Sequence, residues 1–104
     1  MAQFDVYTNP NPATNRTIPF LLDIQTDLLN NLTTRVVIPL YTVSAMSKAA
    51  KPLNIRLSVQ RIIVIMSTAE LAGVAANRLG DKVCSLKEDR NEIIAAIDFL
   101  VTGI

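Results

Sequence analysis

The sequence predicts a mainly β, α+β fold class in which an antiparallel sheet or small barrel precedes a single C-terminal helix. About five or six short segments, each alternating in hydrophobicity or rich in β-branched residues, occupy most of the chain. After Ser85 the apolar residues recur instead with the period of a helix. The 104 residues suffice for one compact domain, so residues 1–104 are expected to form a single domain.

Three segments in the first half of the chain have the pattern of strands. Gln3–Thr8 alternates apolar and polar residues, and two Asn-Pro pairs at residues 9–12 then break the strand. The alternation returns over Pro19–Asp27. Val36–Leu40 is a short β-branched run, and because Pro39 lacks an N–H donor we expect this strand at a sheet edge or at a bulge.

The middle of the chain predicts a loop followed by a pair of strands. Ser44–Lys51 is rich in Ala, Ser and Lys and is expected to form a loop or a turn of helix before Pro52. Leu53–Val59 and Arg61–Ser67 are two runs of Ile, Val and Leu separated by a short polar interval, which together indicate paired strands.

A helix is predicted at the C-terminal end of the sequence. Ser85–Glu88 has the Ser-x-x-Glu form of a capping box, whose two side chains accept the free N–H groups of a first helical turn. Four apolar residues recur at helical spacing and are expected to face the core: Leu86, Ile93, Ile97 and Leu100. The last four residues are mostly apolar, so we expect them either to tuck into the protein or to contact a partner.

Composition limits the classes of partner. Ten Lys and Arg stand against nine Asp and Glu without any basic run, which argues against direct binding of duplex nucleic acid. Half of the residues are hydrophobic, a surplus in so short a chain that indicates an oligomer. The sequence shows no signal peptide, no apolar stretch long enough to span a membrane, and a single cysteine, so we expect a cytoplasmic protein without membrane contact.

No group of residues in the sequence has the spacing of a catalytic site. The chain has no histidine, which removes the usual general acid or base and the commonest metal ligand. Cys84 is expected to be a small buried residue rather than a nucleophile or ligand. Asp23 and Asp27, four residues apart, are interpreted as parts of a solvated turn. We therefore expect no enzyme activity, no cofactor and no metal.

Four stretches of the sequence point to one family. They are QFDVYTN at Gln3–Asn9, LLDIQTDLL at Leu21–Leu29, RVVIPL at Arg35–Leu40, and the tail from Thr68 to Ile104. With these motifs at this spacing, the chain closely resembles the CcdB family of toxins, the toxic halves of type II toxin–antitoxin modules. The similarity covers nearly the whole chain and is weakest from Tyr41 to Val59.

The resemblance implies both a fold and a function. The fold is a homodimer of CcdB/MazF-like, SH3-type barrels, each with a five-stranded antiparallel sheet, a smaller second sheet and one C-terminal helix. The function is to bind the A subunit of DNA gyrase and trap the gyrase–DNA cleavage complex, which blocks replication and transcription. A cognate CcdA-like antitoxin neutralises such toxins and represses the operon together with them, so operator DNA is contacted only through the antitoxin.

The resemblance also implies a gyrase-binding surface that joins an apolar pair to the last helical turn and the chain end. The residues at these positions are Leu28, Leu29, Asp98, Val101, Thr102, Gly103 and Ile104. The best-known family member has a tryptophan in place of Thr102, an aromatic residue in place of Val101 and a neutral amide in place of Asp98. Phe99 is expected to pack against the sheet or, alternatively, to supply the missing aromatic anchor.

Two further implications concern the antitoxin and the competing functions. The antitoxin is expected to contact the loops at Asn9–Arg16 and Tyr41–Lys51. The related MazF toxins share this architecture but are sequence-specific mRNA endoribonucleases, and fold alone does not distinguish the two functions. The missing histidines and the near-zero charge favour the gyrase poison. A third alternative is a degenerate toxin that still binds the antitoxin and acts as a decoy.

Overall fold

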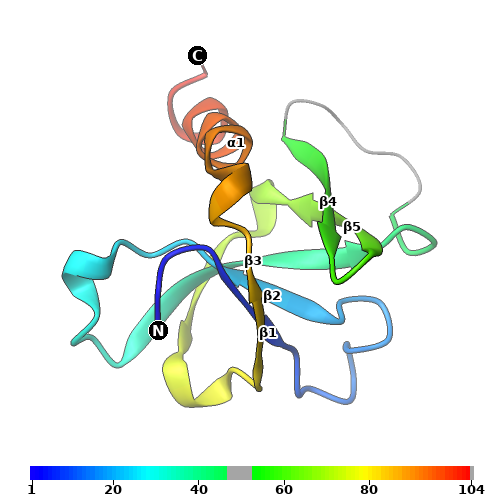
Figure 1. Ribbon diagram of the computed structural model, residues 1–104, viewed down its shortest axis with the longest axis horizontal. Helices are drawn as coiled ribbons and strands as arrows, with labels where there is room; N and C mark the ends of the chain where they lie inside the picture. Colours follow the sequence, from blue (N-terminus) through cyan, green and yellow to red (C-terminus); the bar gives the residue numbers. More distant parts are fainter. Residues whose placement is uncertain (47–52, 104) are drawn as a thin grey trace.

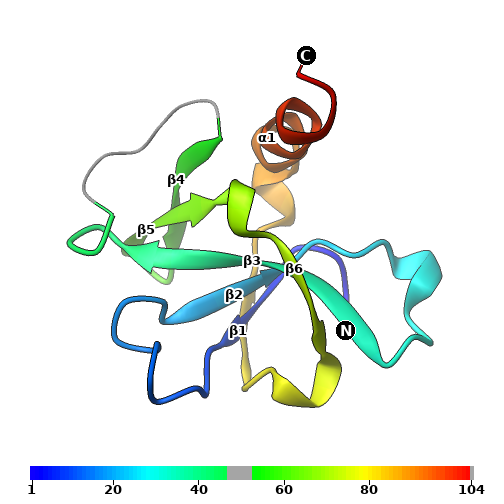
Figure 2. The same ribbon diagram turned by 180° about the vertical axis from the view of Figure 1, so that it is seen from behind.

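The computed structural model describes residues 1–46 and 53–103, so the loop expected at Ser44–Lys51 lies mostly outside the described residues. In this part of the chain one sheet and one α-helix are found (Figures 1 and 2), which confirms the mainly β, α+β fold class. The strands are β1 (Asp5–Thr8), β2 (Phe20–Asp23), β3 (Thr34–Thr42), β4 (Asn54–Val59), β5 (Ile62–Ser67), β6 (Ala72–Ala75) and β7 (Lys82–Ser85). The helix is α1 (Arg90–Thr102), and the 3₁₀ turns are η1 (Asp27–Leu29), η2 (Thr68–Glu70), η3 (Ala76–Arg78) and η4 (Lys87–Asp89).

The long strand β3 is central in the antiparallel sheet, whose order is β4-β5-β3-β2-β1-β7 with β6 also paired to β3. On one side β3 pairs with β2, and on the other side it pairs with β6 at residues 34–37 and with β5 at residues 40–42. The expectation that Pro39 marks an edge strand is therefore wrong. The proline is accommodated because Ile38 and Pro39 lie between the ends of β6 and β5, where that side of β3 has no paired residue.

The predicted pair of strands at Leu53–Val59 and Arg61–Ser67 is confirmed as the β4–β5 hairpin. Its two turn residues, Gln60 (φ 49°) and Arg61 (φ 70°), both have left-handed backbones, as two-residue hairpin turns of type I′ require. The hairpin continues the main sheet through β3, so the smaller second sheet that the resemblance implies is this curled extension (Figure 1).

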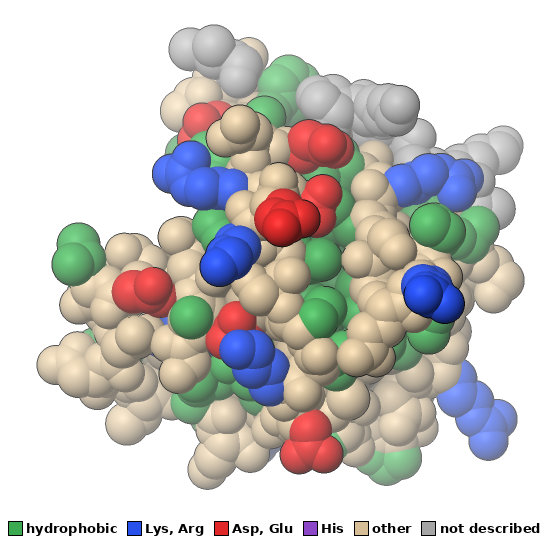
Figure 3. Space-filling view, in the orientation of Figure 1, with side chains coloured by type: hydrophobic (Ala, Val, Ile, Leu, Met, Phe, Trp, Pro, Cys, Tyr) green, Lys and Arg blue, Asp and Glu red, His purple; other side chains and the backbone are tan. Residues whose placement is uncertain are grey.

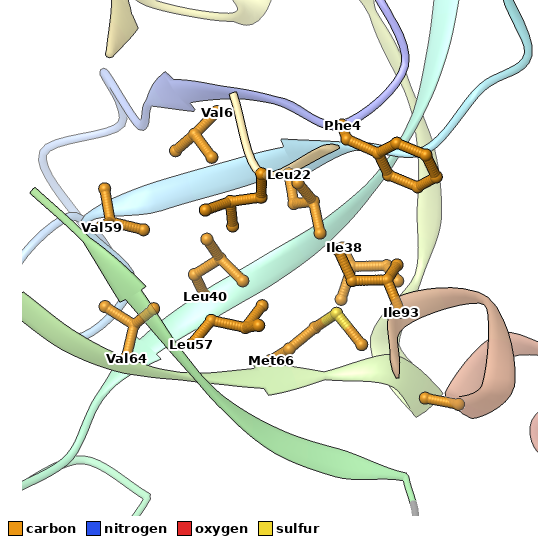
Figure 4. Close-up of a cluster of buried hydrophobic side chains, with 12 residues drawn as sticks. Phe4, Val6, Leu22, Ile38, Leu40, Leu57, Val59, Val64, Met66 and Ile93 are labelled. Carbon is orange, nitrogen blue, oxygen red and sulfur yellow. The ribbon is translucent and has the colours of Figure 1, made fainter. Parts of the chain in front are cut away.

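One face of the curled sheet and helix α1 enclose the hydrophobic core (Figure 4). The strand register places Val6, Leu22 and Ile38 side by side on β1, β2 and β3, and all three are fully buried. Val64 and Met66 of β5 pack against them because the sheet curls back over its own apolar face. The core is therefore shared between the two halves of one sheet.

Helix α1 closes the open side of this core. The expected apolar stripe is confirmed for Leu86 and Ile93, which are buried, and for Ile97, which packs against them half-buried. Leu100 is only half-buried, and Ala96 takes a fully buried place instead. Ala96 lies three residues after Ile93 on the same helical face, and its small side chain lets the helix backbone approach the sheet.

The capping box expected at Ser85–Glu88 is not formed. Ser85 still belongs to β7, where it pairs with Asp5 of β1, and its hydroxyl accepts only the N–H of Lys87 at 3.3 Å. The chain then passes through η4, and α1 begins at Arg90 without a side-chain cap. The strand pairing holds Ser85 in an extended conformation, so the helix starts later than the motif indicates.

Two adjacent isoleucines of α1 provide a test of this packing. Ile93 is fully buried, whereas Ile94 is half-buried at the margin of the core. Ile93→Ala should lower the free energy of unfolding by about 2–5 kcal/mol, since it leaves a cavity between helix and sheet. Ile94→Ala is the matched control, and its loss of unfolding free energy should be smaller than that of Ile93→Ala by about 1 kcal/mol or more. Urea denaturation measures both, and equal losses would contradict the placement of α1.

Candidate functional site

The connection between β2 and β3 exposes three leucines, and we call residues 24–33 the leucine loop. Leu28 is 89% exposed, Leu29 45% and Leu32 47%. Large apolar side chains so exposed on one short segment are typical of a surface that binds a partner. Leu32 was not among the expected site residues, because its only sequence signal is one apolar residue between polar neighbours.

Local hydrogen bonds hold the turn that carries Leu28. The Thr26 hydroxyl accepts the N–H of Leu28 at 3.3 Å, and the Asp27 carboxylate accepts the N–H of Gln3 at 2.7 Å. The turn η1 lies wholly in the described part of the chain and contains no buried residue. Its leucines are displayed to solvent rather than used to anchor the loop.

Asp23 and Arg35 form a buried ion pair beneath the leucine loop. The Arg35 Nε donates to Asp23 Oδ2 at 2.8 Å, and Nη2 lies 2.6 Å from the same oxygen. Nη2 has no hydrogen-bond partner among the described residues, so this second contact is purely ionic. The strand expected over Pro19–Asp27 ends at Asp23, and the solvated-turn interpretation is wrong for Asp23, although Asp27 is exposed in η1.

The ion pair belongs to a polar cluster on the sheet face opposite the core. Strand alternation turns Asp5, Tyr7, Asp23 and Arg35 away from the Val6 face, yet all four are buried. Burial, followed by the charges of Asp5 and Asp23, raises the pKa of Tyr7 to about 12, so its hydroxyl stays protonated and donates to Asp5 Oδ2 at 3.4 Å. Burial also raises the pKa of the Asp23 carboxyl, an effect that Arg35 opposes.

The end of α1 presents a second exposed surface. Asp98, Val101 and Thr102 share one helical face and are exposed, and Val101 reaches 73%. The Thr102 hydroxyl donates to the Asp98 carbonyl at 2.7 Å, so it is used within the helix. Gly103 ends the helix with φ 75°, a left-handed conformation that favours glycine, and its N–H donates to the Phe99 carbonyl.

Two expectations for the chain end have different outcomes. Ile104, the last of the expected site residues, lies outside the described residues. Phe99 is 38% exposed and is not among the side chains of the core cluster, so the expectation that it packs against the sheet is not confirmed. Its ring remains available as an aromatic contact, on the side of α1 away from Val101.

The leucine loop and the end of α1 are not adjacent within one chain. Figures 1 and 2 both place the leucine loop at a lateral edge of the sheet and the C-terminal end of α1 at the top. On the face seen in Figure 3, hydrophobic side chains project at the edge formed by this loop, while Lys and Arg are interspersed with Asp and Glu elsewhere. The expected site residues therefore form two surfaces.

A surface pocket of about 500 Å³ lies between the β1–β2 connection and η3, away from the C-terminal end of α1. Its lining residues are Asn9, Pro10, Asn11, Leu21, Val74 and Arg78. Asn9 orders one wall, because its side-chain amide donates to Thr14 and to the Ile18 carbonyl while its oxygen accepts the N–H of Asn11. The pocket thus includes part of the expected antitoxin loop Asn9–Arg16.

Gly80 fixes the other wall of the pocket against β1. Its N–H donates to the Thr8 carbonyl at 3.0 Å, and a Cβ at this position would lie 2.0 Å from the Thr8 hydroxyl oxygen. Only glycine permits this approach of the two backbones. The contact brings η3, and with it Arg78, beside the Asn9 loop.

Two observations on the described residues concern metal binding and the reactivity of Cys84. No group of three or more His, Cys, Asp or Glu in residues 1–46 and 53–103 could hold a metal ion. Cys84 is half-buried, and burial raises the pKa of its thiol, which makes it a poor nucleophile. Within the same ranges, no helix has the length and hydropathy needed to cross a membrane.

Comparison with known proteins supplies the family. Residues 3–103 match the family described as CcdB protein. The chain belongs to the CcdB family of toxins. An endoribonuclease solved in complex with its cognate antitoxin, from Mycobacterial species, has a similar structure, with a TM-score of 0.77 and 13% sequence identity over 97% of this chain and 94% of that chain. At this identity the likeness shows the fold alone. A search of curated proteins found no significant match.

The buried ion pair of this CcdB family toxin can be tested by a double-mutant comparison. Arg35→Met alone should lower the free energy of unfolding by about 3–5 kcal/mol, because it strands the Asp23 carboxylate in the protein interior. Asp23→Leu combined with Arg35→Met removes both charges and should cost less than Arg35→Met alone. Urea denaturation of these two variants and of Asp23→Leu provides the values, and single losses that simply add in the double variant would show that the two charges do not interact.

Proposed function

We propose that this protein is a gyrase poison: it binds the A subunit of DNA gyrase and traps the enzyme on cleaved DNA, without catalysing a reaction itself. The observation that supports this most is the exposure of Leu28 and Val101, at 89% and 73%, at positions where the family resemblance implies gyrase contact. Apolar side chains so exposed gain binding free energy when a partner buries them. Membership of the CcdB family supports the same function.

We further propose that the protein acts as a homodimer. Among residues 1–46 and 53–103, seven large apolar side chains beyond the N-terminal methionine are exposed, an amount that a second copy or a partner would cover. They are Leu28, Leu29, Leu32, Ile62, Ile63, Phe99 and Val101. A dimer would also present two leucine loops and two helix ends to gyrase, whose A subunits are themselves paired in the enzyme.

The antitoxin is proposed to bind at the pocket beside the Asn9 loop. This pocket lies at the edge opposite the end of α1, so a CcdA-like antitoxin could bind there without first displacing gyrase from the helix end. That the similar endoribonuclease was solved with its cognate antitoxin supports the existence of an antitoxin partner. Repression of the operon would then reach operator DNA only through the antitoxin.

A MazF-like endoribonuclease is the competing function, suggested by the fold of the similar structure. The chain has no histidine, and the face in Figure 3 intersperses charges of both signs, neither of which favours RNA cleavage. Incubation of labelled RNA with the pure protein distinguishes the endoribonuclease from the gyrase poison. Sequence-specific cleavage would show that the protein is an endoribonuclease and would contradict the gyrase proposal. A protein that binds antitoxin but neither binds gyrase nor arrests growth would instead be the decoy.

Calorimetric titration with the dimerisation fragment of a gyrase A subunit tests the main proposal. Leu28→Ser should weaken binding about tenfold or more, because it removes an exposed apolar contact. Deletion of Gly103–Ile104 should abolish binding, and Thr102→Trp should change the preference between gyrases. Arg56→Ser is the control, since Arg56 is exposed on β4 and belongs to none of the proposed surfaces. Equal affinity of all variants would contradict the proposed surface.

The antitoxin pocket makes a separate prediction. Arg78→Ala removes one wall of the pocket and should weaken binding of the cognate antitoxin about threefold to tenfold, with gyrase binding unchanged. Arg56→Ala, an exposed arginine on the opposite edge strand β4, is the control and should leave both affinities unchanged. An Arg78→Ala protein that binds antitoxin normally would place the antitoxin elsewhere.

A further inference from the structure

Two buried polar side chains hold the leucine loop from the interior of the protein. Arg35 Nη1 donates to the Asn30 side-chain oxygen at 2.7 Å, and Gln25 Nε2 donates to the Leu29 carbonyl at 3.0 Å. Arg35 is 1% exposed and Gln25 is 7% exposed, whereas Asn30 is on the surface. The two contacts therefore connect the interior to the backbone that presents the leucines.

Both buried side chains are in turn fixed by the sheet. Asp23 accepts the Nε–H of Arg35 through Oδ2 and the backbone N–H of Gln25 through Oδ1, at 2.8 and 3.0 Å. The side-chain oxygen of Gln25 accepts the N–H of Val36 at 3.1 Å. The chain of contacts thus runs from the strand ends of β2 and β3 through Asp23, Arg35 and Gln25 to the loop.

Hydrophobic burial anchors only the first residue of this loop, Ile24, which packs against the core, and it does not hold the part that carries the leucines. Leu28, Leu29 and Leu32 are all exposed, and η1 contains no buried residue. A three-residue 3₁₀ turn has little stability of its own. The loop conformation accordingly depends on hydrogen bonds, and those from Arg35 and Gln25 are the ones that come from buried groups.

We infer that Arg35 is a positioning residue for partner binding: by holding Asn30, it keeps the leucine loop in the conformation that presents Leu28 and Leu29. A loop ordered before it binds loses less conformational entropy in the complex, so its affinity is higher. The inference rests on the proposed gyrase binding for its functional part. Its structural part, the ordering of the loop, can be measured on the toxin alone.

The test removes the contact at its exposed end, so that the buried ion pair is left intact. Asn30→Ala deletes the acceptor of Arg35 Nη1, and Asn30→Asp keeps an oxygen in the same place. Asn31→Ala is the matched control, because Asn31 is the adjacent exposed asparagine of the loop and its side chain makes no hydrogen bond with the described residues. Hydrogen exchange follows the amides of Leu29 and Leu32, which donate within the loop to the Thr26 and Leu29 carbonyls.

We expect Asn30→Ala to speed exchange at these two amides about tenfold while the core amides are unchanged, and Asn30→Asp and Asn31→Ala to leave exchange as in the parent. In calorimetry with the gyrase A fragment, Asn30→Ala should bind about threefold to tenfold more weakly, and Asn30→Asp should restore affinity. The hydrogen-exchange measurement tests whether Asn30 orders the loop, and the calorimetric measurement tests whether that order raises affinity, so each can give a negative result without the other.

Exchange in Asn30→Ala that equals that of Asn31→Ala would overturn the inference, as would faster exchange with unchanged affinity. If the parent toxin binds no gyrase fragment, the proposed function fails. The exchange rates then still decide whether Arg35 orders the loop.

Discussion

Arg35 places a guanidinium group in the interior of a domain of only 104 residues, and this buried charge must be balanced by its surroundings. A buried charge is tolerated only when it is paired and hydrogen-bonded, and Asp23 meets this need from the end of the neighbouring strand. Because the pair joins β2 to β3 where the two strands separate, it also sets the point at which the leucine loop begins. Strands β2 and β3 therefore contribute to the hydrophobic core with one face and to the ion pair with the other.

The division of the sheet into two different faces explains how so small a domain can be rigid and still expose apolar side chains. The core face buries Val6, Leu22 and Ile38 under helix α1 and the curled hairpin. The exposed apolar residues lie instead on the leucine loop, on the β4–β5 hairpin and at the helix end. These exposed side chains can change without loss of the core, since none of them belongs to the buried cluster.

The distance between the end of α1 and the antitoxin pocket matters for the proposed mechanism. The left-handed Gly103 ends the helix, and the Gly80–Thr8 approach holds the pocket, whereas the leucine loop borders the pocket because the Thr33 carbonyl accepts the N–H of Ala76 in η3. If gyrase binds the helix end and the antitoxin binds the pocket, as proposed, both partners could contact one toxin together for a time. Such a transient complex would allow the antitoxin to remove the toxin from gyrase.

Alternation of apolar residues and the change of period after Ser85 sufficed to predict strands β1 to β5, the β4–β5 pair and the C-terminal helix, because these features depend on which face of an element is buried. The short strands β6 and β7 were not predicted. The motifs sufficed for the family. The place of Pro39 in a central strand depended on the gap between β5 and β6, which no local pattern encodes. Likewise, Asp23 resembles a turn residue until the pairing of β2 with β3 brings Arg35 beside it, and the exposure of Leu32 depends on how the loop between these strands lies in the folded chain.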